Sequence, residues 1–320
     1  MNKENLTAYE VVTEENLTDI HSTGWLLRHK KTGARVMLIE NDDENKVFNI
    51  AFRTPPKDST GVAHILEHSV LCGSREFPLK DPFVELVKGS LNTFLNAMTY
   101  PDKTCYPVAS CNDKDFQNLM HVYLDAVFHP NIYKREEIFR QEGWNYHLEQ
   151  KEGPLKYNGV VYNEMKGAFS SPDEVLEREI MNHLFPDTTY GCESGGDPKN
   201  IPDLTYENFL NFHRTYYHPS NSYIYLYGNM DMEEKLAFID EHYLSHFDYL
   251  DVDSVIQEQK AFGACRDVTL EYPVAENEGE EDNTYLSYNM VVGNAADSQM
   301  AMAFEVLDYA LLSAPGAPLK

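Results

Sequence analysis

The order of the predicted elements indicates an α+β fold built on a largely antiparallel sheet. Short runs rich in β-branched and aromatic residues are joined by hairpin-like connections, so neighbouring strands should run antiparallel. Amphipathic helices follow these strands in groups instead of alternating with single strands. With 320 residues, 42% hydrophobic and 24% charged, the chain is long enough for one large core or two domains.

The first quarter of the chain is predicted to consist mainly of strands. Residues 1–22 are polar, and we expect them to form an irregular lead-in. Residues 25–28 and 35–39 flank a turn that contains glycine, which predicts a hairpin. Residues 47–52 form a third predicted strand, which ends shortly before two consecutive prolines.

Capping residues and hydrophobic residues at helical spacing predict a series of helices in the middle of the chain. They cover residues 61–71, 82–88, 116–127, 135–144, 159–168, 173–184, 205–216 and 231–246. The expected N-cap of the first helix is one of Asp58, Ser59 and Thr60. The helices that begin at about residues 82, 173, 205 and 231 have Asp81, Asp173, Thr205 and Asp231 as their expected N-caps. Further strands are predicted over residues 92–99, 104–110 and 222–227.

A change in composition at residues 251–264 predicts a linker. We therefore expect one α+β domain over residues 1–250 and the incomplete start of a second, similar domain over residues 265–320. The second part contains two predicted strands and one predicted helix, over residues 266–272, 284–292 and 297–312. Because these elements do not complete a domain, we expect the natural protein to continue.

Charge and cysteine usage narrow the classes of function. A net charge of −26 disfavours nucleic acid and anionic membranes as partners and would suit basic peptides. No run of 18 apolar residues and no secretory leader are visible in the sequence. Five cysteines without a C-x-x-C pair indicate neither a disulfide framework nor a thiolate zinc site, so we expect a reduced, cytoplasmic protein.

The strongest chemical signal is the segment from His64 to His68, which has the pattern H-x-x-E-H with Glu67 as its acid. On a helix, positions i, i+3 and i+4 lie on one face, so two imidazoles and one carboxylate converge. A catalytic zinc site uses this set: two nitrogen ligands and a base beside the reacting water. The pattern is the inverzincin signature, but with 12 histidines in the chain it also arises by chance and needs a third ligand.

Glu142 and Glu164 are the two candidates for the third ligand. An acid on an apolar helix is costly to bury unless it is paired or bound to a metal. Glu164 follows Val160 and Val161 on a helix that we expect to be largely buried, whereas Glu142 lies among charged residues. This pattern favours Glu164 and leaves Glu142 open.

Several longer segments resemble the presequence-protease branch of the pitrilysin/insulinase metallopeptidases. They occur in the family's order from about residue 24 onward, at residues 64–74, 81–83, 95–99, 158–169, 221–228 and 307–319. The resemblance implies a pitrilysin/mitochondrial-processing-peptidase-like metallohydrolase fold. It also implies one Zn²⁺ per chain, bound by His64, His68 and Glu164, with Glu67 as the general base.

The family's enzymes are built from four similar α+β domains, and their two halves close around an unfolded peptide. The implied function is a zinc-dependent endopeptidase that degrades short unfolded peptides, with the C-terminal half of the same protein as a partner. The family takes an arginine and a tyrosine for the transition state from that C-terminal half. We therefore expect the chain alone to be weakly active or inactive.

The resemblance also implies substrate-binding residues. Residues 93–99 are similar to the family's edge strand, which pairs with the substrate backbone and includes Asn96 and Ala97. Leu71 and Phe83 correspond to a hydrophobic pocket for a substrate side chain. From the residues alone, an ordinary sheet strand and ordinary core positions remain the simpler interpretations.

Two other functions are compatible with the fold but are less favoured by the residues. A non-catalytic homologous scaffold subunit is disfavoured by the complete H-x-x-E-H pattern together with Glu164, because such subunits usually lose a ligand. A small-molecule metalloenzyme on the same fold is disfavoured by the resemblance to a peptide-binding edge strand.

Overall fold

The computed structural model describes every residue except 81, 273, 275–278, 280 and 320. The chain divides into two compact units, Met1–Pro273 and Val274–Lys320, which are described separately. The predicted N-cap at Asp81 lies outside the described residues. No helix in the described part of the chain is long and apolar enough to cross a membrane.

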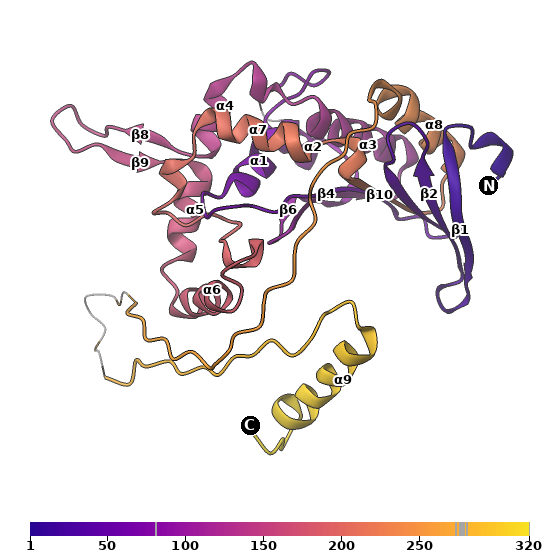
Figure 1. Cartoon of the computed structure of the whole chain (residues 1–320). Coiled ribbons are helices and arrows are strands. Elements are labelled where there is room, and N and C mark those ends of the chain that lie inside the picture. Colours follow the sequence, from indigo (N-terminus) through magenta and orange to yellow (C-terminus); the bar gives the residue numbers. More distant parts are fainter. Residues whose placement is uncertain (81, 273, 275–278, 280, 320) are drawn as a thin grey trace. The chain divides into compact units, whose positions relative to one another are not determined.

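An eight-stranded sheet forms the centre of the first unit (Figure 1). Its strands run in the order β1-β2-β3-β10-β4-β7-β5, and β6 pairs with β7 at the same edge as β5. Only the β3–β10 pair is parallel among these described strands, so the predicted α+β fold with a largely antiparallel sheet is confirmed. The strands are β1 Tyr9–Leu17, β2 Ser22–His29, β3 Arg35–Glu40, β4 Lys46–Arg53, β5 Asn92–Leu95, β6 Met98–Thr99, β7 Lys103–Ser110 and β10 Ser222–Gly228.

The helices of this unit supply the other side of the hydrophobic core. They are α1 Val62–Val70, α2 Pro82–Gly89, α3 Asp113–Phe128, α4 Glu136–Glu142, α5 Val160–Ala168, α6 Pro172–Leu184, α7 Tyr206–Tyr216 and α8 Met232–His242. Alternate residues of β4, such as Phe48 and Ile50, are fully buried, as are Phe116 and Tyr123 of α3. A small hairpin of β8 (Asn145–His147) and β9 (Lys156–Asn158) projects beyond the helices (Figure 1).

The helix starts differ in part from the prediction. Thr205 and Asp231 cap α7 and α8 as expected, each accepting a hydrogen bond from a backbone N–H of the first turn. Helix α1 begins instead after Gly61, whose φ is 70°. The carboxylate of Asp58 is engaged by Thr60, at 3.0 Å from its backbone nitrogen and 2.6 Å from its hydroxyl, so it caps no helix.

Three further expectations in the first unit differ from the structure. The polar residues 1–22 are not an irregular lead-in, because they contain β1, which pairs with β2 along its length. As an edge strand, β1 exposes most of its side chains and needs little apolar alternation. Helix α6 has Ser171 as its N-cap, so Asp173 lies in the first turn. The predicted strand over residues 92–99 is interrupted between β5 and β6.

Among its described residues, the second unit contains the α-helix α9 Ser298–Asp308, with Asp297 as its N-cap, and a π-helical segment Tyr309–Ser313 follows it. The predicted helix over residues 297–312 is thus present. The predicted strands over residues 266–272 and 284–292 are absent, and these residues have no regular secondary structure. A strand needs a hydrogen-bonded neighbour, and no described residues pair with either segment. The proposed domain boundaries stay predictions; within residues 251–264, Ser254 is buried and donates to the side chain of Asn221.

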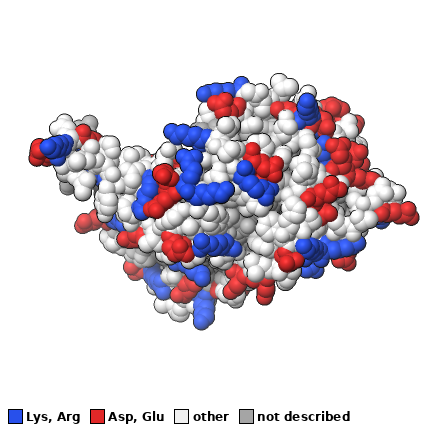
Figure 2. Space-filling model, turned by 90° about the horizontal axis from the view of Figure 1, so that it is seen from above, with Lys and Arg blue, Asp and Glu red and all other residues white. Residues whose placement is uncertain are grey.

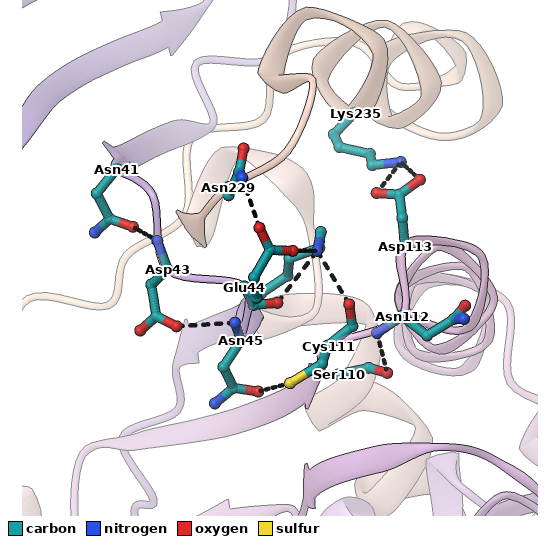
Figure 3. Close-up of polar contacts among 11 residues, drawn as sticks. Asn41, Asp43, Glu44, Asn45, Ser110, Cys111, Asn112, Asp113, Asn229 and Lys235 are labelled. Atoms are coloured by element: carbon teal, nitrogen blue, oxygen red, sulfur yellow. Dashed lines mark hydrogen bonds and ion pairs between the residues drawn. The ribbon is translucent and has the colours of Figure 1, made fainter.

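Polar side chains connect the loops at one end of the sheet (Figure 3). Lys235 of α8 is only 1% exposed, and its ammonium lies 3.3 Å from the carboxylate of Asp113 in the first turn of α3. The amide of Asn229, just after β10, donates to the carboxylate of Glu44 at 2.9 Å. The first contact joins α8 to α3, and the second joins the loop after β10 to the loop before β4.

Candidate metal centre

Helix α1 presents the H-x-x-E-H residues from the interior of the protein. Its apolar residues Ile65, Leu66 and Val70 are fully buried in the core, which fixes the rotation of the helix. His64 and Glu67 are themselves buried, with 9% and 8% of each residue exposed. Burying a polar side chain costs free energy unless it has a hydrogen-bonding or ionic partner. The partners of His64 and Glu67 therefore determine their orientation and their protonation.

His64, His68 and Glu164 bring one ligand atom each to within 4.8 Å of one another. The Oε2 atom of Glu164 lies 3.8 Å from Nε2 of His64 and 3.7 Å from Nε2 of His68. Ligands about 2.0–2.1 Å from a tetrahedral ion lie roughly 3.4 Å apart, and both distances from the Glu164 oxygen to the imidazoles are close to that value. The three residues therefore suit a single zinc ion once the ligand atoms draw together. No other three-residue group of this kind occurs among the described residues.

The outer nitrogen of each imidazole has its own partner. Nδ1 of His64 lies 3.1 Å from the carbonyl oxygen of Gly195, which can only accept, so Nδ1 carries the proton. Nδ1 of His68 lies 3.5 Å from the carboxylate of Glu142. Both contacts leave Nε2 directed at Glu164, with its lone pair available for a metal.

Three carboxylates surround the two imidazoles and make the site favourable for a cation. Burial lowers the pKa of His68, but the hydrogen bond with Glu142 and the charges of Glu67, Glu142 and Glu164 raise it above its ordinary value. Burial raises the pKa of Glu142, but its contacts with His68 and Gln141 lower it below its ordinary value. A bound divalent ion would replace the proton as the positive charge of this cluster.

Glu164 is not the buried acid that its apolar neighbours predicted. Helix α5 buries Val161 and Met165 but leaves Val160 43% exposed, and the side chain of Glu164 is 54% exposed. Glu142 is the buried acid, at 6% exposure. Glu164 nevertheless completes the three-residue group because α5 borders the cavity in front of both Nε2 atoms, while Glu142 faces the back of His68.

A cavity of about 670 Å³ opens in front of this group. The predicted substrate-binding residues Leu71, Phe83, Asn96 and Ala97 all line it together with the H-x-x-E-H residues. The wall also includes Glu142, the alternative candidate for the third ligand, and Met98 and Thr99 of the predicted edge strand. Cys72, Val84 and Tyr100 line the same cavity.

Thr99 of β6 is the residue of this wall with the clearest polar role. Its hydroxyl donates to Oε2 of Glu67 at 2.9 Å and fixes the direction of that carboxylate. Thr99 and Glu67 come from a strand and a helix that are adjacent only in the fold, so no short-range pattern in the sequence indicates their contact.

Comparisons with known proteins place the chain in a family. The family model described as "Insulinase (Peptidase family M16)" matches residues 52–191, and the one described as "Peptidase M16 inactive domain" matches residues 203–320. Protein HypA of Clostridium perfringens is 59% identical over 314 residues, which are 98% of this chain and 32% of that protein. Presequence protease 1, chloroplastic/mitochondrial, of Arabidopsis thaliana is 50% identical over 315 residues, 98% of this chain and 29% of that protein.

The chain thus spans about a third of the length of these curated relatives. The crystal structure of pitrilysin shares the fold, with a TM-score of 0.58 and 18% identity over 73% of this chain and 24% of that one. The two matching models belong to one family and together span most of the chain. With the presequence proteases as relatives and pitrilysin as a structural neighbour, the chain belongs to the pitrilysin/insulinase family of peptidases, family M16.

Proposed function

We propose that this chain carries the zinc centre of an endopeptidase that degrades short unfolded peptides. The observation that supports it most strongly is the convergence of Nε2 of His64, Nε2 of His68 and one oxygen of Glu164, beside the buried carboxylate of Glu67. The donor set, two imidazoles and one carboxylate, is that of catalytic zinc sites with an open position.

In the proposed mechanism, His64, His68 and Glu164 hold one Zn²⁺. When bound, the ion supplies a Lewis acid that lowers the pKa of a water and polarises a peptide carbonyl. Glu67 acts as the general base: its carboxylate accepts the proton of the attacking water and later delivers it to the leaving amine. The hydroxyl of Thr99 holds that carboxylate in one orientation, at 2.9 Å, and so positions it for both proton transfers.

Peptide substrates would bind along the edge of the sheet beside the cavity. Strands β5 and β6 both pair with β7, and among the described residues no strand lies beyond them. Their outer backbone groups can pair with an extended peptide, which requires the substrate to be unfolded. Asn96 and Ala97 link the two strands and line the cavity, while Leu71 and Phe83 offer apolar surface for a side chain.

The proposed partners are an unfolded peptide, with basic ones favoured by the net charge of −26, and the C-terminal half of the same protein. On the face shown in Figure 2, lysines and arginines are scattered among acidic side chains instead of forming a basic stripe. A cytoplasmic location stays a proposal, and a non-catalytic scaffold is not favoured, because the relatives include presequence proteases.

The test is the zinc content of the purified chain by elemental analysis. We expect about one zinc per chain in the wild type and much less in Glu164→Ala. Glu177→Ala, which changes an exposed glutamate of α6, serves as the matched control and should retain the metal. Equal zinc in all three proteins would remove Glu164 from the ligand set and leave Glu142 to be tested, whereas a wild type without zinc would refute the metal centre.

The variant Glu67→Gln tests whether Glu67 is the general base and not a metal ligand. We expect this variant to keep the zinc content of the wild type, because Glu67 is not part of the converging group. Peptide cleavage, measured in the protein with its C-terminal half, should fall by several orders of magnitude when the base is lost. Loss of zinc from Glu67→Gln would contradict the assigned role.

A further inference from the structure

The loop between α6 and α7 lies between the two helices that carry the metal group. A Cβ atom added at Gly61, where α1 begins, would meet the carbonyl oxygen of Gly195 at 2.7 Å. A Cβ atom added at Gly195 would meet the methyl of Met165 at 2.8 Å. Because Met165 follows Glu164 on α5, residues 193–197 form a spacer in contact with both helices, hereafter the spacer loop.

The spacer loop is also hydrogen-bonded to the metal group and to the start of α1. The carbonyl of Gly195 accepts from Nδ1 of His64 at 3.1 Å. The backbone nitrogen of Gly195 donates to Oε1 of Glu193 at 3.0 Å, so a single residue, Gly195, connects a carboxylate to a ligand imidazole through its N–H and its carbonyl. The nitrogen of Glu193 donates to the hydroxyl of Ser59 at 3.1 Å, and the nitrogen of Asp197 donates to the carbonyl of Ser59 at 2.8 Å.

Arg178 of α6 connects this loop to the helix of the third ligand. Its guanidinium carbon lies 3.4 Å from the centre of the ring of Phe169, the C-cap residue of α5. Its Nε lies 3.6 Å from Oε2 of Glu193. The arginine side chain is only 13% exposed, so this pair is largely removed from water. Arg178 therefore contacts Phe169 at the end of α5, the helix of Glu164, and also Glu193, which binds the backbone of Gly195 behind His64.

We propose that Glu193 and Arg178 are positioning residues that set the separation of His64 and Glu164 for metal binding. They act through the Gly195 peptide and the Phe169 ring and contact neither metal nor substrate. The inference rests on the proposed function, because it takes His64 and Glu164 as ligands. Partners of this kind fix the orientation of a ligand imidazole, and their loss weakens metal affinity by about 10- to 100-fold.

The experiment measures the zinc dissociation constant of the 320-residue chain by competition with a chelator. The variants are Glu193→Ala, Glu193→Gln and Arg178→Lys, and the melting temperature of each zinc-free protein is measured in parallel. Glu174→Gln is the matched control, because Glu174 is the outer, 56% exposed carboxylate that lies 3.7 Å from the same guanidinium.

We expect Glu193→Ala to weaken zinc binding about 10- to 100-fold and Glu174→Gln to change it less than about twofold. Glu193→Gln should lose less than Glu193→Ala, because its amide oxygen still accepts from Gly195. Arg178→Lys should weaken zinc binding, because an ammonium cannot stack on Phe169 and reach Glu193 at the same time. If Glu193→Ala does not fold, the zinc affinities of Arg178→Lys and Glu193→Gln test the proposal instead.

Unchanged zinc affinity in the folded Glu193 and Arg178 variants, with or without a lower melting temperature, would overturn the inference and leave these residues a merely structural role. A wild-type chain that binds no zinc would overturn the proposed function, and this inference with it. A wild type that binds zinc as tightly as Glu193→Ala would overturn only the inference.

Discussion

The buried His213 should make the stability of this protein depend on pH. Nε2 of His213 donates to the carbonyl of Val127 at 2.9 Å, and the hydroxyl of Tyr133 lies 2.7 Å from Nδ1. Burial lowers the pKa of His213 from 6.5 to about 4. As the pH falls, the unfolded chain therefore binds the proton before the folded chain does. The stability that the neutral ring contributes is fully present above pH 6.5 and is lost as the pH falls toward 4.

The size of this effect follows from the two pKa values. A difference between 6.5 and about 4 corresponds to roughly 3 kcal/mol of unfolding free energy, of which about 2–3 kcal/mol is lost between pH 7 and pH 4.5. The test compares the wild type with His213→Gln by urea unfolding at both pH values. Glutamine does not titrate and can offer one donor and one acceptor in the same directions.

Other titrating groups are common to the wild type and the variant, so the difference between them isolates His213. At pH 7 we expect His213→Gln to be less stable than the wild type, and by pH 4.5 this gap should have shifted by about 2–3 kcal/mol in favour of the variant. His147→Gln, at an exposed position on β8, is the control and should give the same gap at both pH values. The reasoning is refuted if the His213→Gln gap is also independent of pH.

Two further predictions concern stability. Gly61→Ala should lower the free energy of unfolding by about 2–4 kcal/mol, because φ is 70° and the new Cβ would meet the Gly195 carbonyl at 2.7 Å. Gly89→Ala, where a Cβ meets nothing within 4 Å, should be neutral or slightly stabilising, and equal costs in urea unfolding would contradict this. Asp113→Asn should cost about 1–2 kcal/mol, because the buried ammonium of Lys235 would keep only the exposed carboxylate of Glu234, at 3.6 Å, as an ionic partner. Adding Lys235→Met should recover most of the melting temperature, and purely additive losses would show that the pair is not coupled.

Local patterns in the sequence were sufficient for most elements of the first unit. The helix that carries His64 and His68 was predicted from its apolar residues and from candidate capping residues before it, and the caps Thr205 and Asp231 were identified from residue type. These features depend on contacts within a few residues, which a sequence displays directly. Strand β1 was missed because an edge strand with mostly exposed side chains lacks the apolar alternation that marks a strand.

The surroundings of the candidate site could not be predicted in the same way. The sequence suggested that Glu164 would be buried and Glu142 solvated, and the structure has the reverse. Burial of an acid depends on which helix face meets the core, and neither the charged neighbours of Glu142 nor the valines before Glu164 determine that face. The prediction of strands over residues 266–272 and 284–292 was wrong for a related reason. An apolar run forms a strand only where a neighbouring strand is available for hydrogen bonding.

By itself, the sequence determined that two imidazoles and a carboxylate lie on one helix face, since that follows from the 3.6-residue period. It also determined the family, through motifs that recur in a set order. Only the tertiary structure decided which distant groups complete the arrangement: Glu164 in front of both Nε2 atoms, Gly195 behind His64, Glu142 behind His68 and Thr99 beside Glu67. The physical reason is that each of these contacts joins elements far apart in the chain, and packing of the whole core sets their distances.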